Sequence, residues 1–347
     1  MGDNMKIHVI ANDGSPLGVV YKDIWGENGR TGVGGAESKL LEMCKAWTDI
    51  GHDLILYNDP FNYDGQHIAQ RPLHSFDPQE DRDILIIFRS PNTRSYGAKG
   101  KKIWWSCDQR TIGDFRSFAT TVDKIVTISP YHAEFFKLTY GIYDSVVIDL
   151  PVISSDYDLA PHVDKKPNSL LFASIPDRGL EVLAEILPRI IGKVDFSVDI
   201  TSGYSLWTGG TDDFNQNYKI KFARFPNVTF HGAIPRKRLI EIQKQSQILA
   251  YPCVYDELFC IAVAETQFAG VYPMTSDYGA LVTTNMGYQL PGLPTDLGWQ
   301  ERYAQDIIDL LKQPDILAER QLEVQKLARD RFDITKILAK WEEVFNG

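Results

Sequence analysis

The sequence predicts an α/β protein built from two doubly wound domains, each a parallel sheet covered by helices on both faces. Short, nearly continuous apolar runs alternate with helical patterns along the 347-residue chain. Such runs are typical of strands that are buried on both faces. The alternation occurs in both halves of the chain, and the chain length suits about two domains.

In the first half, residues 36–51 have the pattern of an amphipathic helix that ends at Gly51. Residues 130–141 predict a second helix, with Pro130 in its first turn and Gly141 after its end. Strands are expected at 7–11, 53–58, 83–88, 101–105 and 124–129.

The second half repeats this scheme, and its tail from Gly298 to Gly347 is expected to be largely helical. We expect a Rossmann-like domain over 1–155, a second over 156–325, and a terminal helix over 326–347 that packs back on the first domain. Helices are expected at 178–191, 237–247 and 262–270, and strands at 169–174, 194–200, 228–232, 248–252 and 271–276.

Composition narrows the choice of partners. The net charge of -10 argues against nucleic acid as the main ligand, because nucleic acids select clustered Lys and Arg. No apolar run approaches the roughly 20 residues of a spanning helix, and the first residues lack a leader pattern.

The four cysteines are scattered, which favours a reducing cytoplasm. The histidines lack metal-ligand spacing. The acidic triplets 81–83 and 156–158 are interpreted as solvated turns, so no metal is expected.

The stretch DELFCIAVAE, residues 256–265, places Glu257 and Glu265 at either end of an apolar run. If a helix starts near Phe259, Glu257 lies in the preceding loop and Glu265 lies more than one turn inside. The N–H groups at the start of such a helix favour an anion such as a diphosphate. The spacing alone equally permits an acid near a helix N-terminus and an unrelated surface glutamate.

The surrounding segment resembles the nucleotide-sugar domain of the family 4 glycosyltransferases, which have the GT-B fold. The resemblance extends over roughly 30–345 and includes Gly-Gly-Ala-Glu at 34–37 and the Arg178-Gly179 pair. It implies two Rossmann-like domains that face each other across a cleft. The matching positions in the second half are Gly232, Pro252, Glu257, Phe259, Glu265, Ala269, Gly270 and Pro273.

The resemblance also implies roles for residues around the donor. Glu265 would accept hydrogen bonds from the ribose hydroxyls, and Glu257 would face the transferred sugar. Arg178 would neutralise the departing diphosphate. The backbone N–H groups of Phe259, Cys260 and Ile261 would hold sugar and phosphate oxygens. Gly34 and Gly35 would allow a close approach to the phosphates, and Gly232 and Ala233 would line the base pocket.

Three positions depart from the family pattern. Ala173 stands where a second basic residue is common, and Cys260 replaces a glycine at the helix entry. Cys107-Asp108 replaces a His-Asp pair that is aimed at the acceptor. Asp108 is expected either to act as a base or orient the acceptor, or to cap the next helix. Trp207 is expected to stack on a sugar or a base.

These features and the resemblance together predict a cytoplasmic, metal-independent glycosyltransferase without a cofactor. The resemblance implies that it is a retaining hexosyltransferase. Its donor would be a nucleoside-diphosphate sugar of the UDP or GDP type. Its acceptor would be a glycan or a glycolipid, with peripheral membrane contact left open. The alternatives are another GT-B enzyme, such as a sugar-nucleotide epimerase or a phosphorylase, and a protein that binds a nucleotide sugar without chemistry.

Overall fold

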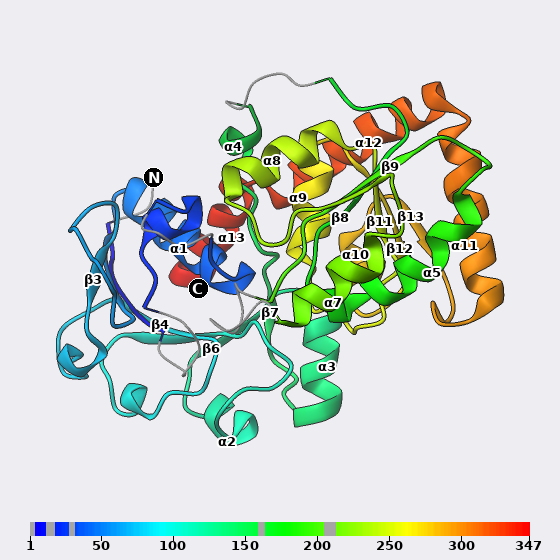
Figure 1. Cartoon of the computed structure of the whole chain (residues 1–347). Coiled ribbons are helices and arrows are strands. Elements are labelled where there is room, and N and C mark those ends of the chain that lie inside the picture. Colours follow the sequence, from blue (N-terminus) through cyan, green and yellow to red (C-terminus); the bar gives the residue numbers. More distant parts are fainter. Residues whose placement is uncertain (1–3, 12–17, 28–31, 159–163, 205–212) are drawn as a thin grey trace. The chain divides into compact units, whose positions relative to one another are not determined.

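A computed structural model of the chain describes residues 4–11, 18–27, 32–158, 164–204 and 213–347. The chain forms two compact units (Figure 1). Unit 1 comprises Met1–Pro151 and Ile334–Gly347, and unit 2 comprises Val152–Asp333. The divisions expected at 155 and 325 therefore lie at 151 and 333. The second shift arises because α12 (Pro314–Phe332) continues without a break to Phe332.

Unit 1 is a parallel seven-stranded sheet with the strand order β3-β2-β1-β4-β5-β6-β7. Right-handed crossovers from β1 and from β5 run in opposite directions along this sheet, so they place their helices on opposite faces. The strands are β1 (Lys6–Ile10), β2 (Asp53–Tyr57), β3 (Ala69–Arg71), β4 (Ile84–Phe88), β5 (Lys101–Trp105), β6 (Lys124–Thr127) and β7 (Val146–Val147). The helices are η1 (Tyr21–Trp25), α1 (Gly35–Asp49), η2 (Leu73–Ser75), η3 (Thr93–Ser95), α2 (Phe115–Ala119), α3 (Pro130–Tyr140) and α13 (Ile334–Asn346).

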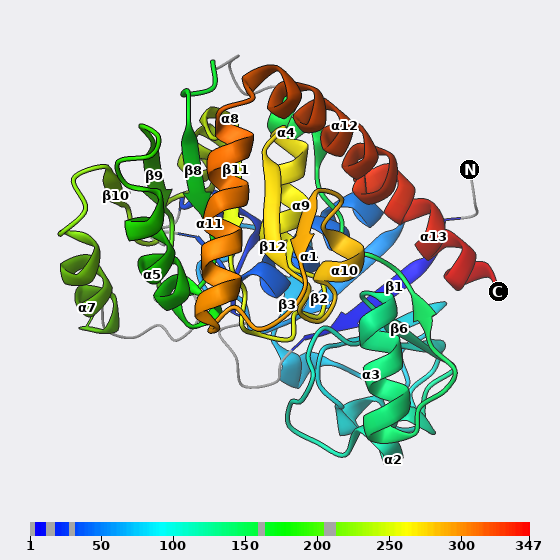
Figure 2. The ribbon, with the colours of Figure 1, turned by 90° about the vertical axis from the view of Figure 1, so that its right-hand side faces the viewer.

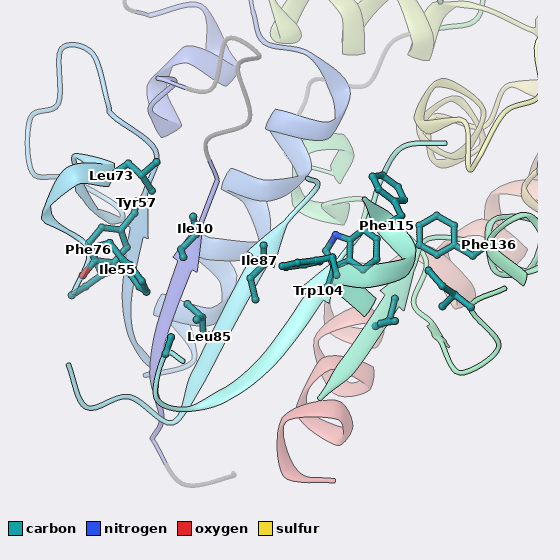
Figure 3. Close-up of a cluster of buried hydrophobic side chains, with 14 residues drawn as sticks. Ile10, Ile55, Tyr57, Leu73, Phe76, Leu85, Ile87, Trp104, Phe115 and Phe136 are labelled. Atoms are coloured by element: carbon teal, nitrogen blue, oxygen red, sulfur yellow. The ribbon is translucent and has the colours of Figure 1, made fainter. Parts of the chain in front are cut away.

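Two adjacent tryptophans at the end of β5 reach opposite faces of this sheet, because side chains alternate along a strand. Trp104 packs on Phe115 of α2 and Phe136 of α3, in the cluster drawn in Figure 3. Trp105 packs on the other face against Trp47 of α1 and Trp341 of α13. The last helix of the chain therefore completes the core of unit 1.

Unit 2 is a parallel six-stranded sheet with the order β10-β9-β8-β11-β12-β13. Both sheets confirm the predicted α/β class and its doubly wound, Rossmann-like plan. The strands are β8 (Ser169–Phe172), β9 (Ser197–Ile200), β10 (Val228–Phe230), β11 (Ile248–Tyr251), β12 (Tyr272–Ser276) and β13 (Tyr288–Leu290).

The helices of unit 2 cover both faces of this sheet. In Figure 2, α5 and α11 lie side by side, and contacts link α12 to α9 and to β12. In the parts of the chain that the structure describes, no helix is long and apolar enough to cross a bilayer. Besides α12, the helices are α4 (Ser154–Asp158), η4 (Pro176–Arg178), α5 (Leu180–Ile190), α7 (Asp213–Phe222), α8 (Arg236–Gln245), α9 (Ile261–Phe268), α10 (Leu281–Thr284) and α11 (Leu297–Leu311).

Each sheet has a switch point, where the direction of strand addition reverses. It lies between β1 and β4 in unit 1, and between β8 and β11 in unit 2. Loops that leave the carboxyl ends of neighbouring strands diverge at such a point, and ligands of open α/β sheets bind there. The switch points are therefore the expected positions of a ligand site in each unit.

Candidate functional site

The loop after β8 is packed tightly against the end of β11. Gly179 follows η4 with φ +132, and a Cβ on it would lie 2.3 Å from the carbonyl oxygen of Pro252. Only glycine allows both this backbone conformation and this approach. The packing holds Arg178 beside the loop that follows β11, across the switch point of unit 2.

Glu257 is the buried centre of this switch point, with 4% of its surface exposed. The guanidinium of Arg178 donates to its Oε2, and the hydroxyl of Tyr251 donates to its Oε1 at 2.6 Å. Gly279 packs so closely that a Cβ there would lie 2.4 Å from the Glu257 carbonyl oxygen. The backbone and both carboxylate oxygens of Glu257 are therefore fixed.

Electrostatics keep the two donors protonated. Burial lowers the pKa of Arg178, but Glu257, Tyr251 and Cys260 together outweigh burial and raise this pKa above its ordinary value. Burial, with Glu257 as a second cause, raises the pKa of Tyr251. The guanidinium also lies over the ring of Tyr255, 4.1 Å from its centroid, which suits a cation.

Helix α9 begins directly after this glutamate. Cys260 is its N-cap and has φ +72, a left-handed conformation that side chains rarely adopt. The ring of Phe259 packs on Phe332, so this side chain belongs to the core. Among the described residues, none accepts a hydrogen bond from the backbone N–H groups of 259–261. Such groups at a helix N-terminus form an anion-binding site.

Glu265 lies inside α9, is also 4% exposed and has a different arginine partner. Arg236, the first residue of α8, donates from Nη1 to its Oε1 at 2.9 Å. The same guanidinium donates from Nη2 to Oδ2 of Asp156 in α4, at 3.2 Å. The interpretation of residues 156–158 as a solvated turn is thus wrong for Asp156, because this residue lies in a helix and pairs with a buried arginine.

The expected base-pocket residues follow β10 at the same edge of the sheet. Gly232 has φ +73, and no atom lies within 4 Å of a Cβ built on it, so a side chain would be strained but not crowded. Ala233 follows it. The preceding His231 places Nε2 2.6 Å from Oδ1 of Asp199. Trp207 lies outside the described residues.

Asp108 belongs to unit 1 and follows β5. Arg89, directly after β4, donates to both of its carboxylate oxygens and also donates to Oε1 of Glu37 on α1 at 2.7 Å. Burial, partly offset by Arg89, raises the pKa of Glu37. The cap of the next helix is Asp114, which accepts from the Ser117 N–H at 3.2 Å. The expectation that Asp108 caps that helix is therefore wrong.

The expected glycines of unit 1 lie at the start of α1. Gly34 is its N-cap and Gly35 is its first residue. Glu37, in the first turn of the same helix, reaches Arg89 across the β1–β4 switch point. Within unit 1, Asp108 is thus connected through Arg89 to the helix that the Gly-Gly-Ala-Glu segment begins.

Within unit 2, the expected residues form two groups rather than one. Arg178 and Glu257 are in contact, whereas Glu265 pairs with Arg236. Sequence reasoning gave no site role to the partners Tyr251, Asp156, Arg89 and Glu37. A signal existed for two of them, since Arg89 and Tyr251 stand at the carboxyl ends of apolar runs.

Residues 184–330 match the family described as glycosyl transferases, group 1. The matched segment includes Gly232, Glu257 and Glu265, and Arg178 lies just before it. No curated protein matches the chain. In the described ranges, no three His, Cys, Asp or Glu side chains are grouped to hold a metal ion.

Solved structures similar to the chain include glycosyltransferases. One from Rickettsia africae has 16% identity, a TM-score of 0.76, and coverage of 99% of this chain and 98% of that one. HepE of Anabaena, crystallised with UDP-glucose, has 14% identity, a TM-score of 0.72, and coverage of 99% and 100%. Sucrose-phosphate synthase of Thermosynechococcus elongatus has 13% identity, a TM-score of 0.73, and coverage of 99% and 98%. At these identities the likeness shows the GT-B fold.

Proposed function

We propose that the chain is a glycosyltransferase whose unit 2 binds a nucleoside-diphosphate sugar, with UDP-glucose as the first donor to test. The observation that supports this most is the start of α9. The N–H groups of 259–261 have no acceptor among the residues that the structure describes, lie between two buried glutamates and follow the Arg178 contact. A diphosphate fits the N–H groups and Arg178. HepE, which has the same fold, was crystallised with UDP-glucose.

The proposed chemistry is transfer with retention and without a metal ion. Breaking the sugar–phosphate bond leaves negative charge on the diphosphate, which the N–H groups of α9 and Arg178 would stabilise. When Arg178 turns to the phosphate, Tyr251 still donates to Glu257, so this carboxylate keeps a partner. Glu257 is proposed to accept hydrogen bonds from the transferred sugar, and the leaving phosphate to take the proton of the acceptor.

Unit 1 is proposed to bind the acceptor, a glycan or a glycolipid. Its Glu37–Arg89–Asp108 cluster has two carboxylates for one guanidinium, which favours neutral hydrogen-bond donors such as sugar hydroxyls over anions. Asp108 is held by Arg89, so we propose that it orients the acceptor hydroxyl rather than removing its proton.

Calorimetric titration of UDP, GDP and ADP, with and without EDTA, tests the donor site. We expect UDP to bind equally well in both conditions. Glu265→Ala should weaken binding about 10–100-fold, since a hydrogen bond to a charged group is worth about 1.5–3 kcal/mol. Glu241→Ala is the matched control, because it removes a half-exposed carboxylate that pairs with a neighbouring arginine on α8.

Turnover is measured separately, as UDP released from UDP-glucose. We expect Glu257→Ala to abolish most of this release while UDP still binds. Failure of all three nucleotides to bind the native protein, or undiminished binding by Glu265→Ala, would overturn the proposed donor site. Binding without any release, with acceptors present, would favour a nucleotide-sugar-binding protein instead.

A further inference from the structure

A buried row of three charges joins α4, α8 and α9 within unit 2. Arg236 lies in the middle, 2.9 Å from Oε1 of Glu265. On the other side its Nη2 and Nε lie 3.2 and 3.4 Å from Oδ2 of Asp156. No more than 10% of any of these three side chains is exposed. Two carboxylates thus share one guanidinium away from water.

Stability does not account for this row. Burying charged groups costs several kcal/mol each, and apolar residues of similar volume often stabilise a protein as much or more. Arg236 also stands in the first turn of α8, where the helix dipole disfavours a cation. Both burial and the helix dipole therefore disfavour Arg236 at this position. Its contact with Glu265 is the feature that could explain why an arginine is present.

Arg236 holds the glutamate that is proposed to receive the ribose. A carboxylate binds a pair of hydroxyls well only if it is ionised and its oxygens point in a fixed direction. A guanidinium in contact with one oxygen provides both conditions, because it favours the charged form and limits rotation of the carboxylate. Without this contact, Glu265 would lose the buried guanidinium that lies 2.9 Å from its Oε1.

Asp156 in turn holds Arg236, and α4 is itself anchored. The hydroxyl of Tyr157 donates to Gln243 of α8 at 3.0 Å, and Lys244 donates to the Tyr157 carbonyl at 3.1 Å. The hydroxyl of Ser154 donates to the carboxylate of Asp333, which is the last residue of unit 2 in the sequence. With α4 fixed on α8, Asp156 holds the two nitrogens Nε and Nη2, and Nη1 is left directed at Glu265.

We propose that Arg236 is a positioning residue for nucleotide recognition, which aims the Glu265 carboxylate at the ribose hydroxyls while Asp156 keeps Arg236 in place. This inference rests on the proposed function, since it requires Glu265 to meet a ribose. It goes further by assigning the selection of ribose over deoxyribose to a side chain that need not touch the nucleotide.

The test compares UDP with 2′-deoxy-UDP and 3′-deoxy-UDP by calorimetric titration. The native protein should bind UDP about 10-fold more tightly than at least one of the deoxynucleotides. In Arg236→Met, which keeps the bulk but removes the charge, this preference should fall below about 2-fold. The loss should come from weaker UDP binding, with deoxynucleotide affinity nearly unchanged. Arg236→Lys should restore part of the preference, and Asp156→Asn should reduce it.

Arg329→Met is the matched control. Arg329 pairs with Asp158 on the same short helix α4, at 2.8 Å, and it should not affect the preference. If the native protein binds all three nucleotides equally or not at all, the proposed ribose contact fails. If it prefers UDP and both Arg236→Met and Asp156→Asn keep that preference, the positioning role is overturned. If Arg236→Met does not fold, the nucleotide preferences of Arg236→Lys and Asp156→Asn test the positioning role instead. Both variants keep a cation beside Glu265.

Discussion

Both sheets place a buried glutamate and a partly buried arginine across their switch point, but the two pairs are built in opposite order. In unit 1, Glu37 lies on the helix after the first strand and Arg89 follows the neighbouring strand β4. In unit 2, Arg178 follows the first strand and Glu257 follows its neighbour β11. One strand plan therefore supports the same ion pair with the charges exchanged.

The second partner of each pair differs as well. Arg89 has a second carboxylate, Asp108, so its cluster has an excess of negative charge. Glu257 has a second donor, the neutral hydroxyl of Tyr251, so its cluster is balanced. The difference in charge between the two clusters indicates that the two switch points suit different ligands. The balanced cluster can release its arginine to a phosphate, whereas the acidic cluster needs its arginine at all times.

Loss of the arginine should therefore be more damaging in unit 1. Arg89→Ala leaves two carboxylates without this cation. Breaking a fully buried pair costs about 3–5 kcal/mol, and the partial exposure of Arg89 and Asp108 reduces this to about 2 kcal/mol. Arg178→Ala should cost about half as much, because Tyr251 still donates to Glu257. Urea unfolding of both variants measures the difference. Equal losses of unfolding free energy in the two variants would show that the second partners, Asp108 and Tyr251, make no difference.

Removal of the neutral donor should affect turnover more than binding. Tyr251→Phe deletes one hydrogen bond to a charged acceptor, worth about 1.5–3 kcal/mol, so UDP release from UDP-glucose should fall about 10–100-fold. UDP affinity should stay within about 3-fold. Tyr303→Phe is the control, since this equally buried hydroxyl donates to the Met274 carbonyl at 2.5 Å. A similar fall in the control would reduce Tyr251 to a structural role.

Acid should weaken unit 1 through its buried histidines. Burial lowers the pKa of His132 to about 3, and burial with the nearby Arg82 lowers the pKa of His8 to about 4. As the pH falls below 6.5, these histidines become protonated in the unfolded chain while they stay neutral in the folded protein. The folded protein therefore loses stability until the pH reaches the lowered pKa values. For His132 the loss from pH 7.5 to pH 5 is about 2 kcal/mol.

His132→Gln should remove that share of the pH dependence. Urea unfolding at pH 7.5 and pH 5, with hydrogen exchange of the strands of each unit, measures it and locates it. The same pH slope in the native protein and in His132→Gln would mean that this histidine does not drive the loss.

The smallest expected effect concerns the start of α9. Because Cys260 has φ +72, alanine there keeps the strain of a left-handed side chain, whereas glycine removes it. Cys260→Gly should therefore be more stable than Cys260→Ala by about 1 kcal/mol, whereas in a helix interior glycine is the less stable of the two. Thermal melts of the two variants check this, and a Cys260→Ala as stable as Cys260→Gly would place the strain elsewhere.

The sequence predicted the fold class because the central strands are continuous apolar runs. It gave no indication of β3, β7 and β13, which are short edge strands. Of the three residues of β3, only Gln70 is buried, so this strand has no apolar run to detect. Edge strands bury less surface than central ones, which is why periodicity finds them poorly.

The candidate site likewise has one part that the sequence predicted and one part that it did not. The spacing of Glu257 and Glu265 is local and was visible in the sequence. Their partners were not, because Arg178 and Arg236 reach them from other elements and spacing does not specify which distant side chains meet. Asp156 shows the limit most clearly, since an acidic triplet resembles a solvated turn until its buried partner is known.

The last helix has a consequence for the order in which the protein can fold during synthesis. Trp341 and Phe345 of α13 pack on Trp47, and Trp341 also packs on Trp105. A growing chain emerges from the ribosome N-terminus first, so unit 2 is complete before α13 exists. The first sheet to be made is therefore the last to gain its full core. A premature stop near residue 333 would damage the beginning of the protein rather than its end.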